Sequence, residues 1–251
     1  MSVGSRTRRA FLAGAATFAA LGSSVLTAAC GKPRTVRDSS QGGVDFKELV
    51  PKKTDDALPL VIAIHGFGGA PEHWVDGWMK FAGDARIVLP RGFEKHEEGF
   101  SWFPYEDRAV DMKSEKLAAD VAAAEERLWK GIRALAAGRR VVIAGYTQGA
   151  MLSFVMAARH PNEVVAAFPV VGACPLSLRP KDKSRAAPVV AYHGAADDVI
   201  DIQSVRESIE AFKREGNEAR LREYAGVRHT ATDAMHGDLD RDMHEAVARA
   251  K

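Results

Sequence analysis

The feature that most constrains the fold is a regular alternation of two kinds of segment after residue 58. Five runs of strand length are almost wholly apolar, at 59–66, 85–92, 139–146, 164–173 and 187–194, and a weaker, alternating one follows at 219–226. Helical stretches lie between them, at 112–138, 148–161, 202–216 and the end of the chain. Strands that are apolar on both faces, separated by amphipathic helices, indicate a parallel sheet covered by helices on both sides. We therefore expect one α/β domain over residues 59–251, with a doubly wound, mostly parallel sheet.

The first 29 residues are typical of an export signal. A basic start with Arg8 and Arg9 is followed by an uncharged, Ala-rich run that ends at Cys30. TRRAFL (7–12) resembles a twin-arginine signal and LTAAC (26–30) a bacterial lipobox, apart from Thr27 where Leu is usual. The resemblance implies an exported bacterial lipoprotein, lipidated at Cys30, at the periplasmic face of a membrane. An ordinary cleavage site with secretion, or an uncleaved anchor of about 20 apolar residues, is the alternative.

The charge of the chain argues against a nucleic-acid partner. The net charge of +2 belongs to the signal, since residues 1–29 hold three arginines and no acids, and their removal leaves −1. No basic face with interleaved aromatic residues is evident, so we expect no nucleic-acid partner. Residues 30–58 are polar and include Gly42-Gly43, which predicts a tether with at most a short element near VDFKELV (44–50).

One motif stands where a strand turns into a helix. GYTQG (145–149) has the frame of a nucleophile elbow, in which Gly145 and Gly149 permit a sharp turn, but Thr147 occupies the central position. The preceding apolar run and the following helical stretch supply the context that this motif requires. A threonine keeps the hydroxyl nucleophile, although its β-branch is unfavourable at the positive φ of an elbow.

Three further segments complete a resemblance to a known family. These are HGFGG (65–69), GFSWFPY (99–105) and HGAADD (193–198), together with the late His229. With the elbow, they resemble the phospholipase/carboxylesterase-type serine esterases of the α/β-hydrolase superfamily, with the N-terminal strands reduced. The order nucleophile, acid, histidine is the order that this fold uses.

The resemblance implies a role for each matching residue. Thr147 would be the nucleophile, His229 the general base and Asp197 the acid that orients it. The backbone N–H groups of Phe67 and Gln148 would form the oxyanion hole. No cofactor and no metal is required, and the substrate would be a small-molecule or lipid ester, with the membrane contacted only through the N-terminal lipid anchor.

Several other residues compete for these roles. Asp198 and Asp201 are the fallback acids, although Asp201 also suits the start of the helix near residue 202. His236 and His244 are rival bases; with Asp240 they recur at helical spacing, which suggests a metal site but is more typical of a solvated face. His65 and His193 each precede a glycine at a strand end and are interpreted as structural.

Two readings of the whole chain remain open. The aromatic residues Trp102, Phe103 and Tyr105 are candidates for a substrate pocket, or else pack over the sheet edge. An exported carboxylic-ester hydrolase is the favoured function. The alternative is a catalytically inactive lipoprotein of the same fold that binds a ligand or a partner, and Thr147 is the feature that separates the two.

Overall fold

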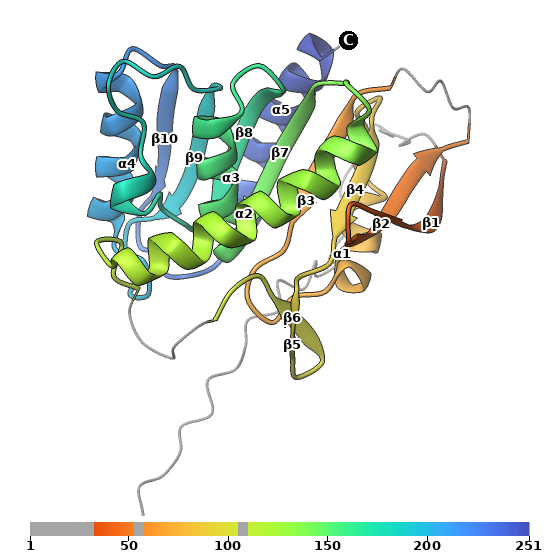
Figure 1. Cartoon of the computed structure of the whole chain (residues 1–251), viewed down its shortest axis with the longest axis horizontal. Coiled ribbons are helices and arrows are strands. Elements are labelled where there is room, and N and C mark those ends of the chain that lie inside the picture. The colour runs from red at the N-terminus through yellow and green to blue at the C-terminus, as the bar shows by residue number, and fades with distance from the viewer. Residues whose placement is uncertain (1–32, 53–57, 105–109, 251) are drawn as a thin grey trace, which may run out of the picture.

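The computed structural model describes residues 33–52, 58–104 and 110–250 and is built around one eight-stranded sheet (Figure 1). The strand order is β1-β2-β4-β3-β7-β8-β9-β10. Strands β3, β4 and β7 to β10 run parallel, and β1 and β2 are antiparallel additions at one edge. The strands are β1 Arg34–Gln41, β2 Val44–Pro51, β3 Leu60–Ile64, β4 Arg86–Pro90, β7 Val141–Tyr146, β8 Val164–Val170, β9 Val189–Gly194 and β10 Ala219–Tyr224.

Helices cover both faces of the sheet, as predicted. One hydrophobic cluster joins a sheet face to α2, α3 and α4, and a second joins the opposite face to α1 and α5. A small hairpin of β5 (Glu94–His96) and β6 (Gly99–Ser101) stands apart from the main sheet. The helices are α1 Pro71–Trp78, α2 Glu115–Ala136, α3 Gln148–Arg159, α4 Ile202–Arg214 and α5 Asp233–Arg249, with a short 3₁₀ turn η1 at Leu176–Leu178.

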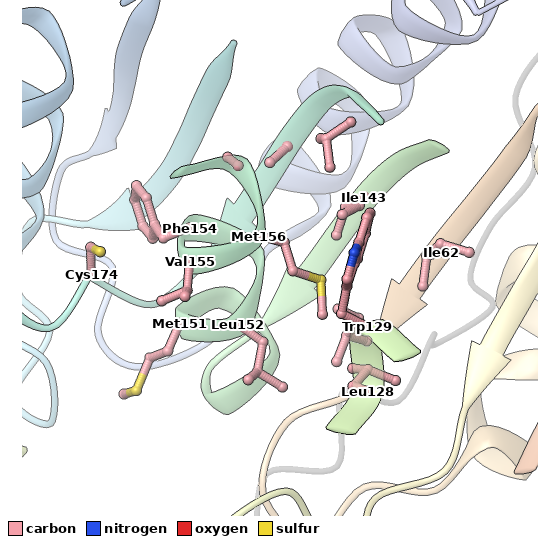
Figure 2. Packing of buried hydrophobic residues seen from close by; sticks show 14 of the residues in the cluster. Ile62, Leu128, Trp129, Ile143, Met151, Leu152, Phe154, Val155, Met156 and Cys174 are labelled. Carbon is pink, nitrogen blue, oxygen red and sulfur yellow. The ribbon is translucent and has the colours of Figure 1, made fainter. Parts of the chain in front are cut away.

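The apolar runs form the central strands because both of their faces are covered. In β3, Ile62 and Ile64 face the cluster below α2 and α3, whereas Val61 and Ala63 face α1 and α5. Figure 2 shows Trp129 of α2 and Met156 of α3 among the buried side chains of this cluster. None of the helices in the described part of the chain is long and apolar enough to cross a membrane.

The prediction of a tether over residues 30–58 is wrong for 34–51: the short element expected near 44–50 is β2, and no strand was expected at 34–41, where β1 forms. This segment forms β1 and β2, which pair over their whole length and join the sheet through β4. Gly42 and Gly43 have φ of +60° and +83°, so they form the tight hairpin turn for which a glycine pair is suited rather than a flexible joint. Residues 35–41 are half-exposed or exposed edge residues, so β1 lacks the apolar alternation that reveals a strand. The N-terminal strands are therefore not reduced.

Arg34 anchors the beginning of this hairpin. Its side chain is buried and its guanidinium donates hydrogen bonds to the carbonyl oxygens of Phe81 (2.6 Å) and Gly83 (2.7 Å), beyond the end of α1. The first strand is thus bound both to its neighbour and to the helical layer. Residues 1–29 of the predicted signal, Cys30 and Tyr105 lie outside the described residues.

We expect Arg34→Met to lower the free energy of unfolding by about 2 kcal/mol, because two buried carbonyl groups lose charged donors while the aliphatic stem is kept. Urea denaturation of the purified protein measures this. Val36→Thr is the matched control on the same strand; since Val36 is 45% exposed, its change should stay within about 0.5 kcal/mol. Equal stability of Arg34→Met and the native protein would show that the hydrogen bonds of Arg34 do not stabilise the fold.

Candidate active site

The sharp strand-to-helix turn predicted at GYTQG is present. β7 ends at Tyr146, Thr147 adopts φ 49° and ψ −107°, and α3 begins at Gln148. A Cβ on Gly145 would lie 2.0 Å from the carbonyl oxygen of Gly149, and a Cβ on Gly149 would lie 2.3 Å from that of Ile64. Both glycines are therefore required by the close approach of helix to sheet.

Thr147 is held in its strained conformation by the backbone around it. Its N–H donates to Val170 of β8 (3.0 Å), and its carbonyl accepts from Ala150 (3.0 Å) and Met151 (3.2 Å) of α3. A β-branched residue with positive φ is a rare and unfavourable arrangement, as expected from the sequence. The turn persists because strand and helix both specify it.

The glycine-rich loop after β3 brings a donor to this hydroxyl. The N–H of Phe67 lies 3.4 Å from Thr147 Oγ1. A Cβ on Gly66 would come within 2.3 Å of the same oxygen, so the loop can approach only because residue 66 is glycine. Strand β6 braces the loop: Gly68 N–H donates to Phe100 O (3.0 Å), and Phe100 N–H donates to Gly69 O (2.8 Å).

Gln148 carries a function that the sequence reasoning missed. Its N–H is at the beginning of α3, where backbone donors have no partner within the helix. Its buried side chain accepts from Trp102 N–H (3.0 Å) and Ser101 Oγ (3.1 Å) and donates to Phe103 O (3.0 Å). The elbow thus fixes the segment that follows β6.

The aromatic residues after β6 pack in the core. Trp102 and Phe103 are 2% and 3% exposed, and the indole N–H of Trp102 donates to His65 O (2.8 Å). Trp102 supports the glycine-rich loop after β3, and neither residue presents an open pocket wall, so the packing alternative describes both.

His65 is a structural residue, as interpreted from its position. Its Nε2 accepts the N–H of Gly92 (3.1 Å), so the ring hydrogen is on Nδ1, which donates to Gly66 O (2.7 Å). Burial lowers the pKa of His65 to about 4. A neutral imidazole therefore links the glycine-rich loop after β3 to the segment that follows β4.

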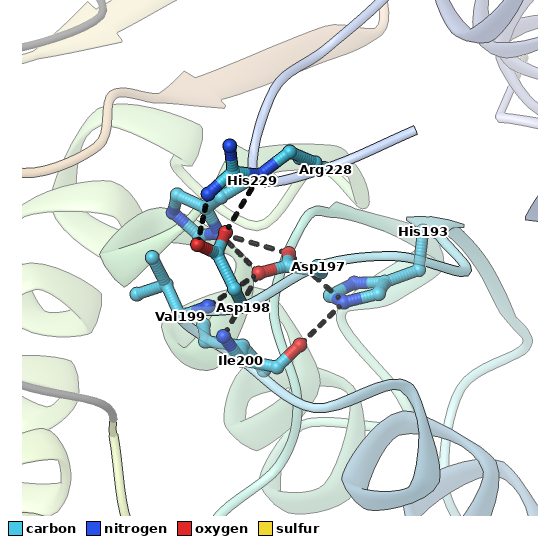
Figure 3. Close-up of polar contacts among 7 residues, drawn as sticks. All are labelled: His193, Asp197, Asp198, Val199, Ile200, Arg228 and His229. Atoms are coloured by element: carbon cyan, nitrogen blue, oxygen red, sulfur yellow. Dashed lines mark hydrogen bonds and ion pairs between the residues drawn. The ribbon is translucent and has the colours of Figure 1, made fainter. Parts of the chain in front are cut away.

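Asp197 follows β9 and contacts His229, which follows β10 (Figure 3). His229 Nδ1 lies 2.9 Å from Asp197 Oδ2 and 3.1 Å from Oδ1, and the N–H groups of Val199 (2.9 Å) and Ile200 (3.0 Å) donate to Oδ1. Burial alone would raise the pKa of this carboxyl, but the hydrogen bonds from His193 and His229 outweigh it and hold the pKa well below its usual range. Asp197 is an ionised hydrogen-bond acceptor for the histidine.

The fallback acids occupy other positions. Asp198 is exposed and forms an ion pair with Arg228, beside the Asp197–His229 contact. Asp201 stands at the N-cap of α4, although its side chain makes no capping hydrogen bond. Of the three acids, Asp197 is the one that meets His229.

The rival histidines belong to α5. The His236 ring lies near Tyr146, and the His244 ring packs on Phe81 while Nδ1 lies 2.7 Å from Asp240 O. Within the described residues no group of three or more His, Cys, Asp or Glu side chains is arranged to hold a metal ion. His244 Nδ1 also lies 3.4 Å from Asp240 Oδ2, but both are solvent-accessible side chains of α5. His229, with 23% of its side chain exposed, contacts a fully buried carboxylate instead.

The topology brings these segments together. β3, β7, β9 and β10 belong to the parallel part of the sheet, and the loop of Phe67, Thr147, Asp197 and His229 follow their carboxyl ends. The carboxyl edge of an open parallel sheet is where ligands bind. A hydroxyl, a backbone donor and a carboxylate–imidazole pair on this edge are the parts needed for acyl transfer.

Comparison with known sequences decides the family. The profile of the phospholipase/carboxylesterase family matches residues 47–243, which includes part of β2 and every segment of the site. The chain belongs to the phospholipase/carboxylesterase family. It is a carboxylesterase-like hydrolase with the α/β-hydrolase fold.

Solved structures of similar fold include two esterases. Esterase PE8 is 22% identical, with a TM-score of 0.66 over 75% of this chain and 92% of that chain. A carboxylesterase from Mesorhizobium loti is 19% identical, with a TM-score of 0.65 over 84% and 98% of the two chains. At such identities the similarity of these structures supports the fold.

The buried His65 makes the hydrolase sensitive to acid. The unfolded chain takes up a proton near the ordinary pKa of 6.5, whereas the folded state does so only near 4. The stability contributed by the neutral ring is therefore fully present above pH 6.5 and is lost as the pH falls toward 4. At 1.36 kcal/mol per pKa unit, the loss in the free energy of unfolding is about 3 kcal/mol. We expect His65→Gln to lose less unfolding free energy than the native protein between pH 7 and pH 4.5 in urea titrations. Val36→Thr, which changes no titratable group, should keep the native slope; identical slopes in all three proteins would exclude this role for His65.

Proposed function

We propose that this hydrolase cleaves carboxylic esters through a Thr147–His229–Asp197 triad. The observation that carries the proposal is the pairing of two contacts at one sheet edge: His229 Nδ1 at 2.9 Å from Asp197 Oδ2, and Phe67 N–H at 3.4 Å from Thr147 Oγ1. The contact with Asp197 orients His229 as a general base. The N–H of Phe67 is a donor near the place where the negative charge of the oxyanion would develop.

The reaction follows from these groups. His229 Nε2 takes the hydroxyl proton of Thr147 while Oγ1 attacks the ester carbonyl carbon, and Asp197 stabilises the resulting imidazolium. The carbonyl oxygen becomes an oxyanion that accepts from the N–H groups of Phe67 and Gln148. The C–O bond to the alcohol then breaks, and the imidazolium returns its proton to the departing oxygen. Water repeats the sequence on the acyl-threonine and releases the acid, so no cofactor is needed.

Threonine slows this chemistry without removing it. Positive φ at a β-branched residue costs about 1–3 kcal/mol, and the methyl group must fit beside the tetrahedral intermediate. At about 1.4 kcal/mol per decade, each effect reduces the acylation rate roughly ten- to a hundredfold. A hydroxyl that reacts slowly would also suit a protein that binds a ligand without cleaving it. A measurement of ester turnover therefore decides between the hydrolase and the ligand-binding protein.

We expect Thr147→Ala to lower kcat/KM for a short-chain aryl ester by at least about a hundredfold and Thr147→Ser to raise it by about tenfold or more, since serine removes the methyl group but keeps the hydroxyl. Labelling by a fluorophosphonate probe should follow the same order. Thr35→Ala, a threonine of β1, is the matched control and should behave as the native protein.

Two other outcomes have definite meanings. Equal inactivity of the native protein and Thr147→Ala, with hydrolysis by Thr147→Ser, would favour the ligand-binding alternative. Equal hydrolysis by all variants would show that the nucleophile is another residue.

We further propose that the enzyme is exported and anchored at the periplasmic face of a membrane through Cys30, where it acts on small-molecule or lipid esters. The support is the sequence TRRAFL followed by LTAAC. In a bacterial host, Cys30→Ala should move the protein from the membrane fraction to the soluble periplasmic fraction, as measured by fractionation and immunoblotting. A Cys30→Ala protein that remains in the membrane fraction would contradict lipidation, and replacement of Arg8 and Arg9 by lysine should separately abolish export.

A further inference from the structure

A second histidine contacts the acid from the side opposite to His229. His193 is the penultimate residue of β9 and its side chain is 0% exposed. Its Nε2 lies 2.9 Å from Ile200 O and 3.1 Å from Asp197 Oδ2 (Figure 3). Its Nδ1 is buried and has no hydrogen-bond partner.

These contacts determine which ring nitrogen carries the hydrogen. The carbonyl of Ile200 only accepts hydrogen bonds, so Nε2 of His193 must be the donor. A hydrogen on Nδ1 as well would be a buried donor without an acceptor, which is unfavourable. His193 is thus a neutral donor that shares one N–H between a carbonyl and a carboxylate.

The two oxygens of Asp197 are held differently. Oδ1 accepts two backbone N–H groups from Val199 and Ile200, which fix its place in the loop. Oδ2 lies between the two histidines, 2.9 Å from His229 Nδ1 and 3.1 Å from His193 Nε2. The oxygen closest to His229 therefore depends on His193 for its second contact.

We propose that His193 is a positioning residue that holds Asp197 Oδ2 toward His229 and takes up part of its negative charge. The inference rests on the proposed function, because it assumes that Asp197 and His229 act on Thr147. His193 itself touches neither substrate nor reacting atoms, and its effect passes through the carboxylate.

The other charged groups around this cluster are paired with one another. Asp198 binds Arg228, which precedes His229 along the chain. Glu223 of β10 binds Arg206 of α4 (2.6 Å). Because each of these charges has an opposite partner, His193 is the neighbour best placed to alter the interaction of Asp197 with His229.

Removal of this donor has two consequences. Without it, the Asp197 carboxylate can tilt while it keeps its hydrogen bond to His229, so the imidazole ring spends less time in the productive orientation and kcat decreases. The carboxylate also keeps more of its charge for the imidazolium, which stabilises the protonated base and moves the acid limb of the kcat/KM profile to higher pH. Loss of a residue with a purely structural role would not move the acid limb of the kcat/KM profile to higher pH, and it would not lower kcat while KM stays the same.

The test compares two variants with a matched control in the purified full-length protein. His193→Phe keeps a planar ring but removes the donor, whereas His193→Gln retains an amide N–H of similar reach. Tyr192→Phe is the control: Tyr192 is the preceding, equally buried residue of β9, and it loses one hydrogen bond to the carboxylate of Asp242 on the other face of the sheet.

We expect His193→Phe to lower kcat about tenfold with KM within about twofold, and to move the acid limb upward by roughly half a pH unit. His193→Gln should recover most of kcat and the native profile. Tyr192→Phe should lose stability in urea but keep both kinetic features. An unchanged profile and kcat in His193→Phe, or equal effects in Tyr192→Phe, would overturn the inference.

A second measurement separates this inference from the proposed function. The hydrogen between His229 Nδ1 and Asp197 gives a low-field proton resonance that does not depend on turnover. It should shift downfield in His193→Phe and return in His193→Gln; an unmoved resonance would overturn the role of His193 even in an active enzyme. Failure of Thr147→Ala to reduce activity would instead overturn the triad, whatever the resonance does.

Discussion

The contact between the backbones of β7, α3 and β3 is the constraint on which the site depends. Because Gly145 and Gly149 have no side chains, the beginning of α3 lies directly against the central strands, and the chain must reverse sharply between them. This reversal lifts Thr147 above the sheet edge and directs the first N–H groups of α3 to the same region. The strained φ of Thr147 follows from that packing and not from any preference of threonine.

Two buried histidines stabilise the two halves of the site in the same way. His65 directly follows β3 and His193 is the penultimate residue of β9; each precedes a glycine, and each is neutral and hydrogen-bonded to a backbone carbonyl. His65 supports the loop that carries Phe67, and His193 supports the loop that carries Asp197. A neutral imidazole is suited to this task because it supplies a buried N–H without adding a charge beside the developing oxyanion or the carboxylate.

The parallel sheet, the sharp turn at Thr147 and the contact between Asp197 and His229 could be predicted from the sequence and its resemblance to a known family. Continuous apolar runs mark strands buried on both faces, and glycines mark the close contacts around Thr147. The first strand leaves no such signal, since β1 exposes most of its side chains and is held by backbone pairing with β2 and by Arg34. The side-chain contacts of Gln148 and His193 were equally hidden, because they join segments far apart in the chain or depend on the direction of one ring nitrogen.

The bound position of Arg34 limits how far the enzyme can move from an anchor. If Cys30 is lipidated, only four residue steps separate the lipid-bearing residue from a side chain that is fixed to the loop after α1. An extended chain covers about 3.3–3.6 Å per residue, so the linker between Cys30 and Arg34 can span at most about 14 Å. Such an enzyme would stay close to the bilayer surface with a restricted choice of orientations, and esters within or beside that surface would meet it far more often than esters in the bulk solution.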